Sequence, residues 1–339
     1  MSSPDVAVVT TRHWAGDPRL NRHLEYLREA GHTASMRTFS EHGRSAALLA
    51  ALREVGRTKA RIVVLPDPEL FFAGSIVCRL TGKRPVIDIH EDYPKAATTR
   101  QWIPGPLRPA ARVAARLAMV LGRLAAWRVM VAAPELARHG DVTVYNIPDP
   151  ASLAPAEHDG SHRLVYVGDI TPARGAMEMV RLLGQLDTSF ELVMIGRIGV
   201  HLAEELTGLA RDLGASTRFR LTGQLAHREA WDLARGSLAG LNLLTPVPAY
   251  RDAVATKLWE YMAVGLPAIV SDLPGQADLL RRVDPDLVCG SARSAAAIAV
   301  ELAANPVRRA SIAKAGRALV EEAWAEYRPD LAIQSIVEP

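Results

Sequence analysis

The sequence predicts an α/β protein built of two successive units, each a doubly wound parallel sheet covered by helices. Short apolar segments alternate with helical patterns along both halves of the chain, which is typical of βαβ units. A stretch without periodic apolar residues, 146–163, separates the two series and reads as a linker. The length of 339 residues also exceeds one comfortable hydrophobic core. We therefore expect an N-terminal domain over 1–150, a C-terminal domain over 151–322 and a final helical segment over 323–339.

The first half contains six predicted strands with helices between most of them. The strands are expected at 6–10, 34–39, 61–65, 85–89, 128–132 and 142–145, and the helices at 20–30, 46–55, 70–80 and 107–126. Parallel sheets of this kind bind ligands beyond the carboxyl ends of their strands. The loops that follow the first and fourth strands are therefore candidate site loops.

The second half repeats the alternation directly after the linker. Strands are expected at 164–167, 190–195, 217–221, 239–243, 268–270 and 287–288, with helices between them, the first at 177–186. The run at 268–270 is wholly apolar, as in a strand that is covered on both faces. The two units then face a cleft, where a ligand would bind.

Composition narrows the class of protein. Hydrophobic residues make up 49% of the chain and the net charge is only +3, so we expect a globular fold without a nucleic-acid partner. Cys78 and Cys289 are far apart and fit no metal or redox spacing, which favours a reducing cytoplasm. No segment has the basic and apolar pattern of a leader or the length of a membrane span.

The loop after the first strand lacks the G-x-G-x-x-G pattern of a dinucleotide site, which argues against a dehydrogenase. In this loop Asp17 and Arg19 either orient an acceptor or serve as a helix N-cap and a surface cation. We weigh these two interpretations about equally.

The fourth strand ends on three consecutive polar residues, His90, Glu91 and Asp92. On an extended backbone such side chains alternate in direction, so they cannot all bind one metal ion. We expect no metal site here. His90 could instead offer a hydrogen bond to a ligand, against the alternative of a structural histidine.

The predicted helix at 107–126 has arginines among Ala, Leu, Val and Met. Arg108, Arg112, Arg116 and Arg123 are spaced to form one basic stripe opposite an apolar face. Such a helix could lie on an anionic membrane, which would make the protein peripheral at the inner membrane surface. An ordinary amphipathic helix with a solvated face is the favoured alternative.

Three glycine-containing loops end strands of the second unit. Gly168 and Gly175 flank Arg174, Arg197 lies between two further glycines, and Gly223 follows a threonine. Glycines permit the close approach of a phosphate and arginines pair with it.

A predicted helix near the same sheet edge carries two further polar side chains. Lys257 and Glu260 lie in its first turns, where the free N–H groups and the ammonium favour a phosphate. The carboxylate of Glu260 can accept hydrogen bonds from hydroxyl groups. Together these elements are suited to hold a sugar nucleotide.

Several of these segments resemble the family 4, group 1 glycosyltransferases. The segments are K-L-W-E-Y-M-A-V-G-L-P-A-I-V-S at 257–271, V-G-D-I-T-P-A-R-G at 167–175, D-I-H-E-D-Y-P at 88–94, D-P-R-L at 17–20 and V-Y-N-I-P-D at 144–149. The resemblance implies the GT-B fold of two Rossmann-like domains and a nucleotide-sugar donor as co-substrate. It also implies transfer to an acceptor hydroxyl with retention of anomeric configuration, no required metal, and a final segment that packs back on the N-terminal domain. The acceptor is expected to be a glycan, a lipid-linked sugar or a small metabolite.

Carried over by position, the resemblance gives roles to individual residues. Arg174 and Lys257 match the cations that neutralise the donor diphosphate, Glu260 matches the carboxylate on the ribose, and His90 matches the histidine near the donor sugar. We take His90, Arg174 and Lys257 as catalytic. The donor-binding set is Gly168, Arg174, Gly175, Arg197, Gly223, Asp252, Lys257 and Glu260, and the acceptor-side set is Asp17, Arg19, Glu91 and Asp92.

This chain departs from the family pattern at two positions. Asp252 stands where a glutamate is usual, and Asp169 stands where many members have an arginine. Two alternatives therefore stay open: a sugar-nucleotide epimerase of the same architecture, and a non-catalytic nucleotide-sugar-binding protein.

Overall fold

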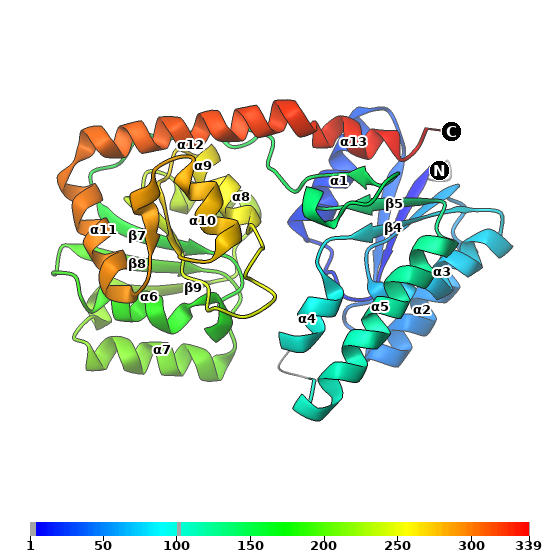
Figure 1. Cartoon of the computed structure of the whole chain (residues 1–339), viewed down its shortest axis with the longest axis horizontal. Helices are drawn as coiled ribbons and strands as arrows, with labels where there is room; N and C mark the ends of the chain where they lie inside the picture. The colour runs from blue at the N-terminus through cyan, green and yellow to red at the C-terminus, as the bar shows by residue number, and fades with distance from the viewer. Residues whose placement is uncertain (1–4, 100–102, 339) are drawn as a thin grey trace. The chain divides into compact units, whose positions relative to one another are not determined.

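The computed structural model describes residues 5–99 and 103–338, so the predicted domain limits at 1 and 339 lie outside the described residues. The chain divides into two compact units (Figure 1). The first comprises Met1–Asn146 with Glu326–Pro339, and the second comprises Ile147–Ala325.

The first unit contains a six-stranded parallel sheet with the order β2-β1-β3-β4-β5-β6. Its strands are β1 (Val6–Thr10), β2 (Ala34–Thr38), β3 (Ile62–Leu65), β4 (Arg84–Ile89), β5 (Arg128–Val131) and β6 (Val142–Thr143). Residues of β1 and β3 are buried throughout because helices cover both faces of the sheet. All six predicted strands are present, with ends that shift by one or two residues.

Helices of the first unit begin at the signals that the sequence provides. They are α1 (Pro18–Glu29), α2 (Arg44–Arg57), α3 (Pro68–Leu80), α4 (Tyr93–Thr99), the 3-10 turns η1 (Gly105–Leu107) and η2 (Pro134–Leu136), α5 (Arg108–Ala125) and α13 (Pro329–Ser335). Pro18 occupies the first turn of α1, where its missing N–H is not needed. The sequence analysis missed α4, because seven residues are too few to show a helical period.

The C-terminal residues belong to the first unit. α13 packs against α1 and β6, and a guanidinium N–H of Arg128 donates to the carbonyl oxygen of Ser335. The rings of Tyr145 and Tyr327 meet edge to face at a centroid distance of 4.9 Å. Arg328 takes a left-handed conformation with φ 38°, and Pro329 occupies the first turn of α13.

The second unit repeats the design with the strand order β12-β11-β10-β7-β8-β9. Its strands are β7 (His162–Val167), β8 (Phe190–Ile195), β9 (Phe219–Gly223), β10 (Ala239–Asn242), β11 (Ala268–Ser271) and β12 (Val288–Cys289). β9 begins two residues later than predicted because Ser216–Arg218 form a 3-10 turn, η4. His162 and Arg163, assigned to the linker from sequence, belong to β7.

Helices lie on both sides of this second sheet (Figure 1). They are η3 (Pro172–Arg174), α6 (Ala176–Leu183), α7 (Val200–Asp212), α8 (His227–Ala234), α9 (Thr256–Ala263), α10 (Pro274–Arg281), η5 (Pro285–Leu287), α11 (Ala292–Ala304) and α12 (Pro306–Tyr327). The predicted helix at 177–186 is present as α6 but ends three residues earlier.

Tyr261 fixes α9 against the sheet. Its side chain is fully buried, and its hydroxyl oxygen accepts a hydrogen bond from the backbone N–H of Val167 at 3.0 Å. Gly240 makes room for the ring, since a Cβ there would lie 2.6 Å from a ring carbon. The same helix carries Lys257 and Glu260, so this contact holds their backbone in place beside the ends of β7 and β10.

Candidate functional site

Two cations of the second unit converge on Gly168, which directly follows β7. A Cβ built on Gly168 would lie 3.1 Å from Nζ of Lys257 and 3.8 Å from a guanidinium nitrogen of Arg174. Gly168 also has φ +131°, which side-chain-bearing residues rarely adopt. A glycine is therefore needed for both charged groups to approach the backbone at this strand end.

Lys257 is buried and has no hydrogen-bonding partner among the described residues. Its Nζ lies 3.6 Å from the ring centroid of Tyr166, a cation–π contact that compensates only part of the lost hydration. Burial, and then the charge of Arg174, lower the pKa of Lys257 well below its usual value. An anion bound here would remove both penalties.

Arg174 is positioned by two loops that pack closely. Its backbone N–H donates to Oγ1 of Thr171 at 3.3 Å. The next residue is Gly175, with φ +80° and a virtual Cβ only 1.8 Å from the carbonyl oxygen of Leu243. Burial lowers the pKa of Arg174, but interactions with Tyr166 and Tyr250 raise it by a larger amount. The net pKa lies above its usual value, so the guanidinium stays charged.

Glu260 lies one helical turn beyond Lys257 and is also largely buried. Its Oε1 lies 2.9 Å from Nε2 of His227, the first residue of α8. The same nitrogen lies 3.1 Å from Nε1 of Trp231. The indole N–H can only donate, so Nε2 of His227 bonds either to the indole or, when protonated, to the carboxylate. The sequence analysis missed His227, since only the fold brings α8 to α9.

The remaining predicted donor residues lie at the ends of neighbouring strands. Gly223 ends β9 with φ +74°, and its carbonyl oxygen accepts from the N–H of Gly196 at 2.9 Å. Arg197 forms an exposed ion pair with Asp169 at 3.1 Å. Asp252 is exposed in the loop between β10 and α9, 4.0 Å from the guanidinium of Arg251. The structure thus brings Gly168, Arg174, Gly175 and Lys257 into one group, with Arg197 and Asp252 more exposed.

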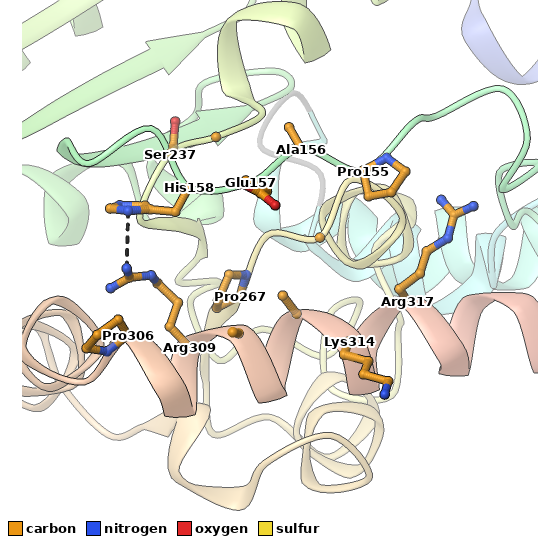
Figure 2. A pocket seen from close by; sticks show the side chains of 14 residues that line it. Pro155, Ala156, Glu157, His158, Ser237, Pro267, Pro306, Arg309, Lys314 and Arg317 are labelled. Carbon is orange, nitrogen blue, oxygen red and sulfur yellow. Dashed lines mark hydrogen bonds between the residues drawn. The ribbon is translucent and has the colours of Figure 1, made fainter.

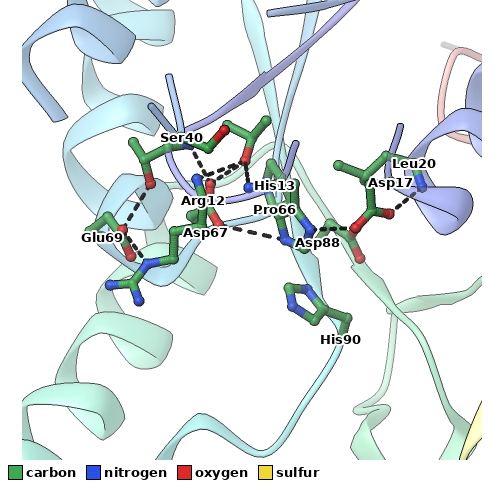
Figure 3. A network of polar contacts seen from close by, with 12 residues as sticks. Arg12, His13, Asp17, Leu20, Ser40, Pro66, Asp67, Glu69, Asp88 and His90 are labelled. Atoms are coloured by element: carbon green, nitrogen blue, oxygen red, sulfur yellow. Dashed lines mark hydrogen bonds and ion pairs between the residues drawn. The ribbon is translucent and has the colours of Figure 1, made fainter. Parts of the chain in front are cut away.

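A polar network in the first unit lies where β1, β3 and β4 end (Figure 3). Asp17 caps α1, since its Oδ1 accepts from the N–H of Leu20 at 3.0 Å. Arg19 makes a two-pronged contact with the fully buried Asp88, at 2.7 and 2.5 Å. The N-cap interpretation of Asp17 is therefore confirmed, whereas the interpretation of Arg19 as a surface cation is wrong. Its guanidinium is largely buried and forms an ion pair with Asp88.

His13, which the sequence analysis did not single out, links two carboxylates of this network. Its Nδ1 lies 2.8 Å from Asp17 and its Nε2 lies 3.6 Å from Asp67. Burial lowers the pKa of His13, but Asp17 and Asp67 raise it by a larger amount, so the net pKa lies above its usual value. Asp67 also accepts from Oγ1 of Thr10 and from the N–H of Thr11, both at 2.7 Å.

His90 lies beside this network. Its ring is 5.1 Å from that of His13, and the hydroxyl of Tyr93 lies 3.1 Å from its Nδ1. Burial, followed by the charges of Arg19 and His13, lowers the pKa of His90 well below its usual value. The lowered pKa favours the neutral imidazole, which can donate one hydrogen bond and accept another.

His90, Glu91 and Asp92 lie beyond the end of β4, whereas the argument against a metal site treated them as part of an extended strand. β4 ends at Ile89, and Asp92 starts α4 by accepting from the N–H of Lys95 at 3.0 Å. Glu91 lies in the turn between them. Within 5–99 and 103–338, no group of three or more His, Cys, Asp or Glu side chains is arranged to hold a metal ion.

One cavity of about 570 Å³ lies elsewhere in the second unit (Figure 2). It is lined by residues 155–158, 236–237, 265 and 267 and by the first turns of α12. Those loops precede β7, β10 and β11, so the cavity lies at the amino ends of the strands, opposite the edge that carries Lys257. Arg309 and His158 meet in its wall at 3.2 Å. We do not assign the site to this cavity, because none of the predicted site residues lines it.

A comparison with protein families gives a match that lies mainly in the second unit. Residues 181–331 match the family model described as "Glycosyl transferase-like". No functionally curated protein matches the sequence.

Solved structures show the same fold over nearly the whole chain. The sucrose-phosphate synthase of Thermosynechococcus elongatus is 15% identical with a TM-score of 0.73, and covers 98% of this chain and 97% of its own. HepE of Anabaena, in complex with UDP, is 12% identical with a TM-score of 0.69 and 98% coverage of both chains. A glycosyltransferase of Rickettsia africae is 13% identical, with a TM-score of 0.69 and 99% coverage of both. The chain therefore has the GT-B fold of these structures, and part of it matches a glycosyl transferase-like family model.

Proposed function

We propose, on the premise that the chain is a GT-B glycosyltransferase, that it moves a sugar from a nucleotide-sugar donor to an acceptor hydroxyl with retention of anomeric configuration. One observation carries the proposal: a buried lysine without a hydrogen-bonding partner lies beside an arginine at the carboxyl edge of a parallel sheet. Two cations this close together fit the diphosphate of such a donor, although Glu260 and Asp169 contribute some opposite charge near Lys257.

The diphosphate would lie between Lys257 and Arg174, close to the backbone of Gly168 and Gly175. Both cations then neutralise the charge that develops on the leaving phosphate as the glycosidic bond breaks. Glu260 would accept hydrogen bonds from the ribose hydroxyls, and Gly223 would allow the base to approach the backbone. No side-chain nucleophile is needed if the departing phosphate oxygen takes the proton of the acceptor hydroxyl.

For the donor we propose a uridine nucleotide sugar that needs no metal ion. Structures of HepE contain UDP and UDP-glucose, and the two cations of this chain would supply the charge that a divalent ion otherwise provides. Asp252 and the Arg197–Asp169 pair would lie near the sugar and the outer phosphate.

We assign the acceptor side to the first unit and the donor side to the second. His90, as a neutral imidazole beside a polar network, would offer a hydrogen bond to the transferred sugar. Glu91 and Asp92 would contribute to the acceptor side. Asp17 and Arg19 would act indirectly by fixing the loop after β1, because both are held by protein partners.

A panel of nucleotide sugars tests the function. We expect nucleoside diphosphate release with one donor, accelerated by a hydroxyl-bearing acceptor, and a product with the donor's anomeric configuration by NMR. Conversion of the donor to its sugar epimer without added acceptor would assign the chain to the epimerases. Tight donor binding with no turnover for any acceptor would assign it to the non-catalytic binding proteins.

Finally, we propose that the protein works at the cytoplasmic membrane surface as a peripheral protein. No helix in the described ranges is long and apolar enough to cross a membrane. The membrane contact would be made by side chains outside the proposed donor site.

A further inference from the structure

Exposed apolar side chains are concentrated on one part of the first unit. The described residues contain fifteen exposed large apolar side chains, of which three lie on α3, one on η1 and five on α5. They are Phe72, Ile76, Leu80, Leu107, Val113, Leu117, Val120, Leu121 and Leu124. We call this set the α3/α5 surface. Single exposed apolar residues are ordinary, but nine of them on α3, η1 and α5, of which α3 and α5 pack together, indicate a binding surface.

The orientation of α5 explains why these side chains are exposed. α3 and α5 pack directly against each other. A Cβ on Gly122 would lie 2.6 Å from Cβ of Phe71, so α5 approaches α3 through its small-residue side. Ala115 and Met119 face the core cluster formed by Phe71, Ile87 and Ile89. The larger side chains are consequently turned outward, which corrects the expectation that the apolar face of this helix lies on the protein.

Most of the charged side chains of α3 and α5 are arginines. α5 contains no acidic residue, and Arg112 and Arg116 are exposed along one flank of its exposed apolar side chains. α3 has a single acid, Glu69, which is paired with Arg12 at 2.6 Å. Arg123 does not belong to the exposed stripe as predicted, because it is buried against Asp141 at 2.6 Å. The surface therefore combines exposed apolar groups with cations that have no acid beside them on their own helix.

We propose that the α3/α5 surface binds an anionic lipid bilayer and holds the first unit where a lipid-linked acceptor is available. The apolar side chains would enter the boundary between headgroups and acyl chains, and Arg112 and Arg116 would meet lipid phosphates. A second copy of the chain is a poorer occupant, since a two-fold interface pairs the surface with itself, and the surface has no unpaired acid to meet Arg112 and Arg116 of the other copy. Naming a lipid-linked acceptor rests on the proposed function, but lipid binding itself does not.

Sedimentation of the full chain with extruded vesicles, without donor, tests the proposal. We expect binding to phosphatidylcholine vesicles that contain about one third phosphatidylglycerol, and little binding to phosphatidylcholine alone. Arg112→Gln and Arg116→Gln should each weaken binding about fivefold, the effect of one cation near an anionic surface. Leu117→Ser with Leu124→Ser should abolish the binding.

Matched control variants keep the test specific. Val200→Ser with Val307→Ser removes two exposed apolar side chains of the second unit, and Arg228→Gln removes an exposed arginine. These controls should bind vesicles like the unaltered chain. All variants should keep the melting temperature and the affinity for nucleoside diphosphate, because none of these residues touches the core or the donor site.

Three outcomes would overturn the proposal. They are no binding to the anionic vesicles, equal losses in the control variants, and a dimer in sedimentation velocity that the leucine substitutions convert to monomer. The last would assign the surface to a second copy. Failure of sugar transfer with intact vesicle binding would instead reject the proposed function alone.

Discussion

The two charged clusters of this protein differ in how their charges are balanced. In the first unit each cation has a carboxylate partner: Arg19 pairs with Asp88, Arg12 with Glu69, and His13 with Asp17 and Asp67. In the second unit Lys257 makes no hydrogen bond within the described residues. The charged side chain next to it at Gly168 is Arg174, which is also a cation. A balanced cluster holds loops in place, whereas an unbalanced one is suited to receive an anion.

The largest expected effect comes from breaking the balance in the first unit. Arg19→Met leaves the buried Asp88 carboxylate without its partner, so we expect the free energy of unfolding to fall by about 3–5 kcal/mol. Urea denaturation measures this loss. Arg181→Met, which breaks the exposed pair with Glu178, is the matched control and should cost less than about 1 kcal/mol. Similar losses for both would mean that Asp88 does not depend on Arg19.

Removing the unbalanced cation should affect binding rather than folding. Lys257→Met should weaken nucleoside diphosphate binding by about 2–5 kcal/mol in calorimetry, the usual cost of truncating one partner of a buried charge pair. The ligand-free protein should be no less stable, because the buried ammonium makes no hydrogen bond and its cation–π contact with Tyr166 offsets only part of the cost of burying the charge. Arg174→Ala should likewise weaken the diphosphate more than the free nucleoside. Equal losses for the two ligands would show a folding role instead.

The carboxylate of the second cluster should contribute less than its lysine. If Glu260 binds the ribose as proposed, Glu260→Gln removes a charge-assisted hydrogen bond and should reduce nucleoside diphosphate affinity by about 1.5–3 kcal/mol. A dideoxyribose analogue lacks the hydroxyls, so its affinity should be the same for both proteins. An unchanged affinity for the hydroxylated nucleotide would remove Glu260 from the site.

The pH dependence of binding should show which cation lacks a partner. The pKa of Lys257 is lowered in the free protein, and a bound diphosphate would raise it again. Binding should therefore take up protons, at most one from this group, and affinity should fall as pH rises through the pKa of the bound form. Calorimetry in buffers of different ionisation enthalpy measures the uptake. If Lys257→Met shows the same uptake, the lysine is not its source.

Substitution of His13 should give the smallest effect. It should change the pH dependence of the free energy of unfolding and not the affinity for a ligand. Its pKa is raised above the usual 6.5, so its contribution to stability is complete below pH 6.5 and is lost as pH rises through the raised value. The slope cannot exceed about 1.4 kcal/mol per pH unit. Urea denaturation at several pH values should show this loss in the unaltered chain and not in His13→Gln. A dependence that survives the substitution would have to arise elsewhere.

Local sequence was enough to predict both sheets and several of the residues that meet at the carboxyl edge of the second sheet. Apolar runs such as 62–65 and 268–270 permit little except buried strands, and glycines mark the points where those strands end. The placement of Gly168, Gly175 and Lys257 at one edge follows, because the carboxyl ends of parallel strands share an edge. The short helix α4 and the exact start of β9 could not be found this way, since a few residues do not establish a period.

Pairings between distant residues were decided only by the tertiary structure. Arg19 and Asp88 are 69 positions apart, so the sequence could not tell a buried ion pair from a surface cation. His227 reaches Glu260 only because α8 and α9 pack on the same side of one sheet. For α5 the amphipathic pattern is visible in the sequence, but which face is buried depends on the close approach of Gly122 to Phe71. Periodicity fixes which side chains share a face, whereas packing against a neighbour determines which face is exposed.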